Sequence, residues 1–364
     1  MIKKKAIIIT FHCCPNYGAV LQTYGLYQYL RTLFQDVEVL DYRPKNLMKE
    51  YDYVNTYSLC STVVSFWSLY DYWKKRRKFS DFLKNMKMSG MSYHTNEKLP
   101  ITEAQYCFVG SDQIWNPDIT HGFDKVYFGY IPHKEPFCVI SYAASFGKAN
   151  FTVEETYALK HLMSNVKYVS VREKTAKFVL EKSLGIKADV VLDPTLLAGK
   201  NYFDRFVQKG RSEDYIFVYT LNNKPENVIR PIARKISKEK KLEIIEINGN
   251  RKWLEHAGHK VIYDAGPEEF LTLLASAKYV VTDSFHGTAF SVLFHRNFVT
   301  IPHKTRGGRM VSLLSTIGLD HRLSARVTTD VIDEEVDWYA VDRRLDLARR
   351  QSEEFIIKSI NNKI

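Results

Sequence analysis

The chain has 364 residues, of which 45% are hydrophobic and 26% charged, and its formal net charge is +11. This length exceeds what one hydrophobic core usually serves, so we expect two domains, and no apolar run reaches the roughly 20 residues of a membrane-spanning helix. The positive charge favours an anionic partner: a phosphorylated small molecule, a pyrophosphate-linked lipid or nucleic acid, although no nucleic-acid-binding motif supports the last. We expect a cytoplasmic protein, because the apolar stretch after the first lysines is too short for a signal peptide.

The five cysteines are odd in number and lack CxxC spacing, which argues against a disulfide framework and against a zinc site. Cys107 and Cys138 fall in apolar runs that predict buried strands. Cys13 and Cys14 fall in a loop after the first predicted strand. Two interpretations stay open for them: a reactive thiol, or unreactive side chains that only fill space in the loop.

The chain begins with a predicted β–α–β unit. A β-rich run covers residues 5–11, a helix with one apolar stripe covers 19–34, and a second strand covers 37–42. Strands and helices then alternate, which predicts a mostly parallel sheet covered on both faces. The further strands are expected at 106–109, 137–142, 168–171 and 190–192, and the helices at 153–163 and from 174.

A second α/β alternation begins near residue 196. We therefore expect an N-terminal Rossmann-like domain at 1–195, a C-terminal one at 196–336, and a charged amphipathic helix at 337–364 that closes the chain. The strands of the second domain are expected at 215–220, 242–247, 279–282 and 298–301, and its helices at 229–237, 268–276 and 288–294.

An insert at 46–94 in the first domain is rich in aromatic and basic residues. Two interpretations stay open: a membrane-surface helix pair at 58–90 that meets anionic lipid or a lipid-linked sugar, and two amphipathic helices that cap the first domain. The pattern consists of Phe66, Tyr70 and Trp73 in a first stripe, the basic run Lys74–Lys78, and Phe79, Phe82, Leu83 and Met86 in a second stripe.

One histidine occupies the first turn of a predicted helix, directly after the strand at 279–282. Asp283 or Ser284 can cap that helix, whose first amides and dipole favour a bound phosphate or carboxylate. His286 could give or take a proton beside such an anion. The competing interpretation is a plain N-cap with a packed core histidine.

Six short motifs occur in one order along the chain. In that order and spacing, from about Ile7 to the C-terminal helix, the sequence resembles the polysaccharide pyruvyl transferase family. The resemblance implies an α/β architecture of the glycosyltransferase-B type, with two Rossmann-like domains facing a cleft and a C-terminal helix returning to the first domain. The motifs are Asn16–Gln22, Val109–Asn116, Ser141–Gly147, Ser170–Glu173, Leu192–Thr195 and Thr282–Gly287.

The same resemblance implies the reaction. The family transfers the enolpyruvyl unit of phosphoenolpyruvate onto two hydroxyls of a sugar, which forms a pyruvate ketal and releases phosphate. The acceptor is expected to be a sugar of a capsular or other surface polysaccharide, or of its polyprenyl-pyrophosphate-linked precursor. Phosphoenolpyruvate is then a substrate, and no further cofactor and no metal are expected. If the insert at 58–90 meets lipid, the protein associates with the inner face of the cell membrane.

The candidate site residues follow predicted strands, at the carboxyl ends where open α/β sheets bind ligands. The catalytic candidates are His286 as the acid and Asp112 as the group that orients or deprotonates an acceptor hydroxyl. The donor-binding candidates are Arg172, Arg309, Ser284, Gly287, Lys304 and Arg306, and the choice among Arg309, Arg306 and Lys304 for the phosphate stays open. The acceptor-binding candidates are Asn16, Tyr17, Gln113, Trp115 and Asn116.

Structural interpretations compete with some of these assignments. Asn16 could be a helix cap, Trp115 a core anchor, and Arg172 the partner of Glu173 in an ion pair. Two other functions also stay open. A nucleotide-sugar-dependent glycosyltransferase of the same fold would use the same basic groups on a pyrophosphate, and a non-catalytic carbohydrate- or lipid-binding protein would use the aromatic insert.

Overall fold

The computed structural model describes residues 2–50, 62–95, 99–134, 137–208, 214–221, 228–248, 257–302, 307–323 and 329–361. The chain forms two compact units. Unit 1 comprises Met1–Tyr51, Leu83–Ala198 and Leu345–Ile364, and unit 2 comprises Asp52–Phe82 and Gly199–Arg344. Within the described residues, no helix is long and apolar enough to cross a membrane.

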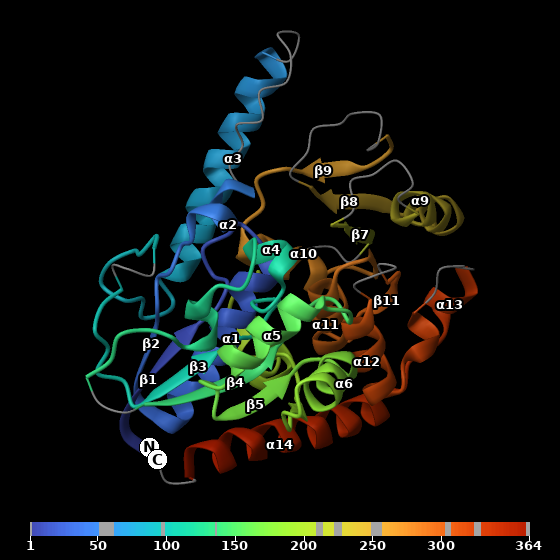
Figure 1. Cartoon of the computed structure of the whole chain (residues 1–364). Helices are drawn as coiled ribbons and strands as arrows, with labels where there is room; N and C mark the ends of the chain where they lie inside the picture. Colours follow the sequence, from blue (N-terminus) through green and yellow to red (C-terminus); the bar gives the residue numbers. More distant parts are fainter. Residues whose placement is uncertain are drawn as a thin grey trace. The chain divides into compact units, whose positions relative to one another are not determined.

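Unit 1 is built on a six-stranded sheet in the order β2-β1-β3-β4-β5-β6 (Figure 1), and all neighbouring strands pair in parallel. The central strands are buried along their whole length, as expected for a sheet covered on both faces. The strand order reverses between β1 and β3, and at such a point open α/β sheets bind their ligands. The strands are β1 (Ile2–Ile9), β2 (Phe34–Val39), β3 (Tyr106–Val109), β4 (Cys138–Ala144), β5 (Tyr168–Val171) and β6 (Asp189–Val190).

The helices of unit 1 carry local start signals. Asn16 caps α1, and Thr152 and Glu155 form a reciprocal capping box at α5. Gly25 lets α1 approach α7 closely, because a Cβ there would lie 2.6 Å from the carbonyl oxygen of Pro194. The helical segments are α1 (Tyr17–Leu33), α2 (Lys45–Glu50), α4 (Pro117–Thr120), η3 (Lys125–Phe128), α5 (Val153–Met163), α6 (Lys174–Ser183) and α7 (Pro194–Ala198).

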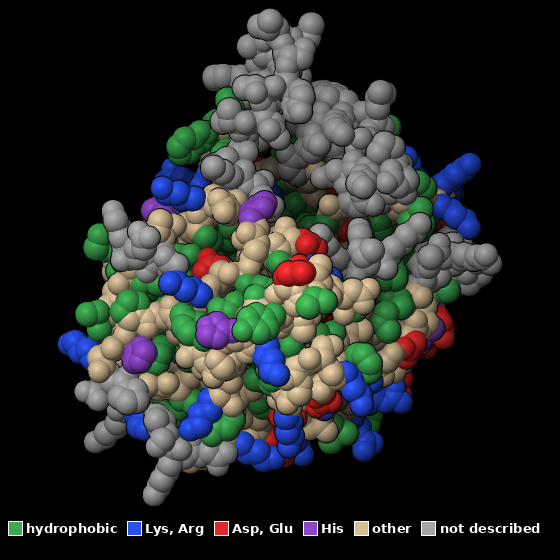
Figure 2. All heavy atoms as spheres, viewed as in Figure 1, with side chains coloured by type: hydrophobic (Ala, Val, Ile, Leu, Met, Phe, Trp, Pro, Cys, Tyr) green, Lys and Arg blue, Asp and Glu red, His purple; other side chains and the backbone are tan. Residues whose placement is uncertain are grey.

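The last helix, α14 (Trp338–Asn361), packs its C-terminal part on unit 1, as the family resemblance implied. Ser352 Oγ accepts a hydrogen bond from Leu192 N at 2.9 Å, and Tyr106 Oη donates to Ile360 O at 2.9 Å. Its polar face is exposed, and Figure 2 shows basic and acidic side chains together along the lower edge of this view, where α14 lies in Figure 1. The helix is therefore amphipathic, as predicted.

Unit 2 contains a five-stranded parallel sheet in the order β11-β10-β7-β8-β9 (Figure 1). Here the order reverses between β7 and β10. The short strand β9 was not predicted from the sequence. The strands are β7 (Tyr215–Tyr219), β8 (Glu243–Ile247), β9 (Lys260–Ile262), β10 (Tyr279–Thr282) and β11 (Asn297–Thr300). The helical segments are α3 (Thr62–Leu83), α8 (Asn201–Asp204), α9 (Ile229–Lys240), α10 (Pro267–Ala275), α11 (Phe285–Leu293), α12 (Gly308–Ile317), η5 (Asp320–Arg322) and α13 (Thr329–Asp333).

The insert at 46–94 is divided between the two units, whereas the sequence predicted that it lies wholly in the first domain. Residues 62–83 form one continuous helix, α3, and its residues up to Phe82 belong to unit 2. Phe82 packs on Phe206 with ring centroids 4.9 Å apart, and Lys78 Nζ lies 2.6 Å from Glu269 Oε1. The second predicted stripe is buried, as core packing requires. The first is exposed at Tyr70 and Trp73, and the side chain of Phe66 lies outside the described part.

Candidate active site

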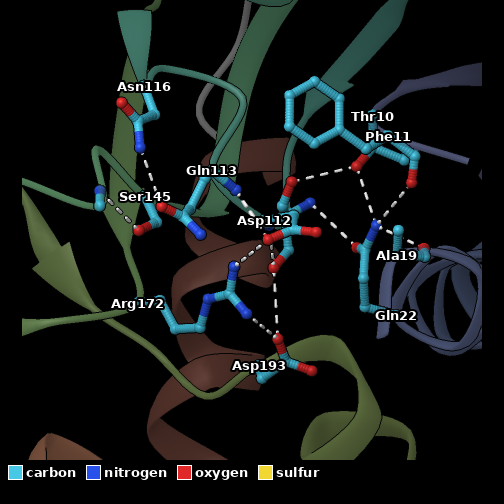
Figure 3. Close-up of polar contacts among 12 residues, drawn as sticks. Thr10, Phe11, Ala19, Gln22, Asp112, Gln113, Asn116, Ser145, Arg172 and Asp193 are labelled. Atoms are coloured by element: carbon cyan, nitrogen blue, oxygen red, sulfur yellow. Dashed lines mark hydrogen bonds and ion pairs between the residues drawn. The ribbon is translucent and has the colours of Figure 1, made fainter. Parts of the chain in front are cut away.

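In unit 1, a buried glutamine joins the two loops that flank the reversal of strand order (Figure 3). Gln22, from α1, donates through Nε2 to Thr10 Oγ1 at 2.9 Å and accepts from Ser111 N at 3.2 Å. Thr10 Oγ1 in turn donates to Ser111 O at 3.0 Å. The loop after β1 is therefore fixed to the loop after β3. Gln22 was not among the predicted site residues, although it lies in the first of the six motifs.

Asp112 follows this junction in a strained conformation. Its φ is +71°, in the left-handed region that residues other than glycine seldom adopt and that is frequent at functional sites. Asp112 Oδ1 accepts from Gln113 N at 2.8 Å and from Arg172 Nη2 at 3.2 Å. The Asp112 carboxylate, which was predicted to contact an acceptor hydroxyl, is thus held in place by Gln113 and Arg172.

Arg172 joins two carboxylates from different loops (Figure 3). Besides Asp112 it contacts Asp193, with Nη1 2.8 Å from Oδ2. The side chains of Arg172 and Asp193 are 1% and 0% exposed, whereas that of Asp112 is 11% exposed. Arg172 therefore binds two carboxylates through its guanidinium group. The sequence predicted such binding to the carboxylate or phosphate of the donor, whereas both carboxylates here are side chains of the protein. In this structure Arg172 orients Asp112 and does not present its charge to a donor.

Two further polar pairs border Asp112. Asn116 Nδ2 donates to Gln113 Oε1 at 2.9 Å, and Ser145 Oγ donates to Glu173 Oε1 at 2.8 Å. Gly147 packs directly against the Gln113 amide, and no larger residue fits there, because a Cβ at that position would lie 1.9 Å from Gln113 Oε1. The amide of Gln113 thus lies in a tightly packed polar layer beside the carboxylate.

Three predicted acceptor-binding residues serve the scaffold in this structure. Trp115 is fully buried: its ring stacks on Phe128 with centroids 5.5 Å apart, and Nε1 donates to Tyr127 O at 2.9 Å. It offers no face to a sugar, so the core-anchor interpretation holds. Asn16 Oδ1 caps α1 by accepting from Ala19 N at 3.2 Å, and Tyr17 is 2% exposed.

In unit 2, Ser284 caps α11, as one of the two sequence alternatives predicted. Its Oγ accepts from Gly287 N at 3.3 Å. Gly287 is required by packing, because a Cβ would lie 2.5 Å from Thr282 Oγ1 at the end of β10. His286 is the second residue of the helix and is 6% exposed. The predicted strand, cap and histidine are all present in the predicted order.

Asp283 bridges the reversal of strand order in this unit. Thr220 Oγ1, after β7, donates to Asp283 Oδ2 at 2.7 Å, and Leu221 N donates to Oδ1 at 2.8 Å. The carboxylate thus ties the end of β7 to the start of α11. From the sequence alone, Asp283 is expected only as a possible cap.

Arg309 lies beside the start of α11. It is the second residue of α12, is half-buried, and holds its guanidinium carbon 5.7 Å from the ring centroid of Phe285. Phe285 meets His286 edge to face at 5.1 Å. A cationic side chain, a titratable ring and the first turns of two helices therefore meet within unit 2. Lys304 and Arg306 lie outside the described residues.

No group of three or more His, Cys, Asp or Glu side chains in the described part of the chain is placed to hold a metal ion. The two polar centres therefore consist of hydrogen-bonding and charged side chains of unit 1 around Asp112 and of unit 2 around His286.

The comparisons with known proteins agree with the ordered motifs. The family model described as polysaccharide pyruvyl transferase matches residues 16–305. No curated protein matches the sequence.

Solved structures resemble the chain in fold. The Neisseria meningitidis UDP-GlcNAc 2-epimerase bound to UDP-GlcNAc is 12% identical, with 98% of this chain and 100% of that chain covered and a TM-score of 0.50. Arabidopsis thaliana UGT89C1 complexed with UDP-L-rhamnose is 9% identical, with 99% and 100% covered and a TM-score of 0.50. The MnaA–UDP structure from S. aureus is 12% identical, with 96% and 91% covered and a TM-score of 0.50. The fold is thus of the glycosyltransferase-B type, with two Rossmann-like domains.

Proposed function

The chain belongs to the polysaccharide pyruvyl transferase family, and we propose that it transfers the enolpyruvyl group of phosphoenolpyruvate onto two hydroxyls of a sugar, forming a pyruvate ketal and releasing phosphate. The observation that carries the proposal is the group in unit 2: His286 in the first turn of α11, and Arg309 at the start of α12, both in contact with the ring of Phe285.

We assign the donor to this group. Phosphoenolpyruvate carries a phosphate and a carboxylate, and helix starts together with a guanidinium are a suitable environment for both. Arg309 is the cation assigned to the phosphate. Lys304 and Arg306 remain candidates from the sequence for the same role. Ser284 and Gly287 shape the helix start, since the serine oxygen caps the glycine amide.

The chemistry then needs an acid. Addition of a proton to the methylene carbon of phosphoenolpyruvate leaves an oxocarbenium-like centre at the neighbouring carbon. A sugar hydroxyl attacks that carbon, phosphate leaves with the electron pair of the carbon–oxygen bond, and the second hydroxyl closes the ketal. His286 is the proposed acid, and the cationic surroundings would stabilise the leaving phosphate.

We assign the acceptor to the polar layer of unit 1. Asp112 is the member of its ion-paired group with the greatest exposure, and Arg172 and Gln113 fix its direction. A carboxylate held in this way can orient a hydroxyl or accept its proton. Gln113 is the amide beside it that remains a candidate for contact with sugar hydroxyls.

Binding and turnover test these assignments separately. Calorimetry with phosphoenolpyruvate on the wild type and on Arg309→Ala, with UDP-galactose as the competing donor, tests donor identity. Binding of phosphoenolpyruvate that weakens in Arg309→Ala supports the proposal, and binding of the nucleotide sugar alone contradicts it. Arg350→Ala, on the exposed face of α14, is the matched control.

Phosphate release with an accepted sugar tests the acid. His286→Ala should lower turnover by about 10²- to 10⁴-fold, the usual contribution of a positioned general acid. His161→Ala, on the exposed face of α5, should leave turnover unchanged. Wild-type turnover in His286→Ala would remove His286 from the mechanism.

We further propose that the acceptor is lipid-linked and that the protein meets it at the cytoplasmic face of the cell membrane through α3. Leu69, Tyr70 and Trp73 are exposed on that helix, beside the exposed cations Lys74 and Arg77. Exposed aromatic and aliphatic side chains with cations nearby are suited to an anionic lipid surface.

Vesicle flotation tests this contact. Wild-type protein should float with vesicles that contain anionic lipid, and Trp73→Ser should reduce the floated fraction. Tyr339→Ser removes an equally exposed aromatic ring from α14 and serves as the control. Equal flotation of Trp73→Ser and wild type would remove α3 from the membrane contact.

A further inference from the structure

A second group of charged side chains lies in unit 1, in the loop between β1 and α1. His12 is buried, and its Nδ1 lies 3.1 Å from Thr10 O while Nε2 lies 2.9 Å from Asp41 Oδ1. Both partners can only accept hydrogen bonds, so both ring nitrogens must carry protons. His12 is therefore an imidazolium. Burial alone would lower the pKa of His12, but the hydrogen bond to Asp41 raises it above its ordinary value.

Asp41 faces a second cation. Arg43 donates to the carboxylate through Nε at 2.6 Å and through Nη2 at 2.9 Å, and Ser92 Oγ donates at 2.5 Å. Although burial alone would raise the pKa of Asp41, these bonds and the one from His12 lower it below its usual range. Two cations thus share one carboxylate, and the group carries a net positive charge.

Cys13 and Cys14 lie against this positive group. Their Sγ atoms are 3.9 Å apart, Cys14 is buried, and Cys13 is partly exposed. The pKa of Cys13 is lowered to about 6: the hydrogen bond from Cys14 lowers it most, burial opposes this, and the charges of His12 and Arg43 also lower it. Most of Cys13 is then thiolate at neutral pH, and the thiolate is the nucleophilic form of cysteine.

Tyr127 is a further polar residue near the two thiols. Its ring packs on Phe11 at 5.1 Å and on Tyr42 at 5.7 Å, and its buried hydroxyl has no hydrogen-bond partner in the described part of the chain. Burial first, then the charges of Cys13 and Asp124, raise the pKa of Tyr127 well above its ordinary value. The phenol therefore stays protonated, and its hydroxyl keeps a hydrogen-bond donor that no described residue uses.

We propose that Cys13 is a modification site that takes small disulfides. The Cys13 thiolate attacks one sulfur of R–S–S–R, a Cys13 Sγ–S bond forms, the S–S bond breaks, and RS⁻ leaves with the electron pair. Release of the adduct by Cys14 is disfavoured, because adjacent Cα atoms are about 3.8 Å apart and disulfides usually need about 4.4–6.8 Å. The mixed disulfide should therefore persist until an external thiol removes it.

The adduct would lie on the loop that supports the acceptor layer. Residues of this loop contact Ser111, the neighbour of Asp112, and cap α1 through Asn16. An effect of the adduct on turnover rests on the proposed function. The reactivity of the thiol does not, so the primary test measures reactivity alone.

The test follows alkylation by iodoacetamide and mixed-disulfide formation with glutathione disulfide, by peptide mass mapping between pH 4.5 and 9. A Cys60→Ser background confines the comparison to the cysteines of the described part. Cys13 should react with a half-maximal rate near pH 6 and should take one glutathione. Cys107 and Cys138, which are buried and whose pKa values are raised, serve as internal controls. A rate at Cys13 that rises only above about pH 8, as for an ordinary thiol, would overturn the proposal.

Two variants separate the causes. Cys14→Ala removes the donor and should move the half-maximal pH upward, while Cys14→Ser keeps a donor and should leave it low. If either buried variant fails to fold, Arg43→Met provides an independent change at a more exposed side chain, and it should also raise the half-maximal pH. Unchanged profiles in the folded variants would contradict the assigned environment.

Discussion

Units 1 and 2 place their polar centres at equivalent points of two parallel sheets, but they fill those points differently. In unit 1, Gln22 hydrogen-bonds to the loops on both sides of the reversal of strand order, and beside it Arg172 is shared between Asp112 and Asp193. In unit 2, Asp283 joins the segments on both sides of the reversal of strand order. His286 and Arg309 lie beside it, at the starts of two helices. One unit uses its charges to fix a carboxylate, and the other gathers groups that favour an anion.

The difference should separate stability from binding. A buried charge that is paired within the protein contributes to the fold, and its loss leaves partners uncompensated. A cation beside a helix start contributes when an anion arrives. Variants in unit 1 should therefore unfold more easily, and variants in unit 2 should fold well and bind the donor less tightly.

The largest effect is expected from Arg172→Met. It leaves Asp112 and Asp193 without their shared guanidinium, so the free energy of unfolding should fall by about 3–5 kcal/mol. Urea denaturation measures the change. Arg350→Met on the exposed face of α14 should change it by less than about 0.5 kcal/mol. Equal stability of the two variants would mean that the unit 1 network does not support the fold.

Arg309→Ala should behave in the opposite way. Its free energy of unfolding should fall by no more than about 1 kcal/mol, from the lost contact with Phe285. Its affinity for phosphoenolpyruvate should fall about 10- to 100-fold, the range for loss of a charged hydrogen bond. Calorimetry and urea denaturation on the same preparation check both parts. If Arg309→Ala is strongly destabilised but binds phosphoenolpyruvate with unchanged affinity, Arg309 supports the fold and not the donor, and the two units do not differ in this respect.

The His12–Asp41 pair in unit 1 should make stability depend on pH. The lowered pKa of Asp41 gives stability that is present above its unfolded value, about 3.9, and is lost as pH falls through the folded value. The raised pKa of His12 gives stability that is present below about 6.5 and is lost as pH rises through the folded value. The stability difference between wild type and Asp41→Asn should therefore be largest, about 1–3 kcal/mol, between about pH 4 and 6.5. A difference that stays constant from pH 3 to 9 would show that the pair is not linked to protons.

The smallest effect is expected from Asn16→Ala. Loss of the α1 cap should lower the free energy of unfolding by about 1 kcal/mol without changing the affinity for phosphoenolpyruvate. Thermal denaturation and calorimetry measure the two quantities. Reduced affinity for an accepted sugar beyond what the stability loss explains would return Asn16 to the acceptor site.

The sequence predicted the elements better than the contacts between them. Hydrophobic alternation predicted both parallel sheets, and the cap of α11 could be read from Asp283 and Ser284 because a cap is a local interaction. The insert was placed in the wrong domain, because an apolar stripe on a helix shows that it packs but not on what. β9 has three residues and too short a pattern to detect.

The sequence could not show contacts between residues that are far apart along the chain. Arg172 meets Asp193 and Asp112 across 21 and 60 residues, so only the fold reveals that its charge is used internally. Trp115 lies in a polar motif, but its ring faces Phe128 in the core. Gln22 and Asp193 lie within the ordered motifs, and this was the only available sign that they matter.

The order of the segments of the two units along the chain affects how the protein can fold during synthesis. It passes from one unit to the other after residues 51, 82, 198 and 344, so unit 1 is assembled from three separated segments. β1, a central strand, lies in the first of these segments, and the third, Leu345–Ile364, follows all of unit 2. Because α14 covers unit 1 with this third segment, unit 1 cannot close until residues 345–364 have left the ribosome. Unit 2 has all of its segments by residue 344, so we expect it to complete its fold first, and a stop shortly before Leu345 should leave unit 1 as the substrate of chaperones and proteases.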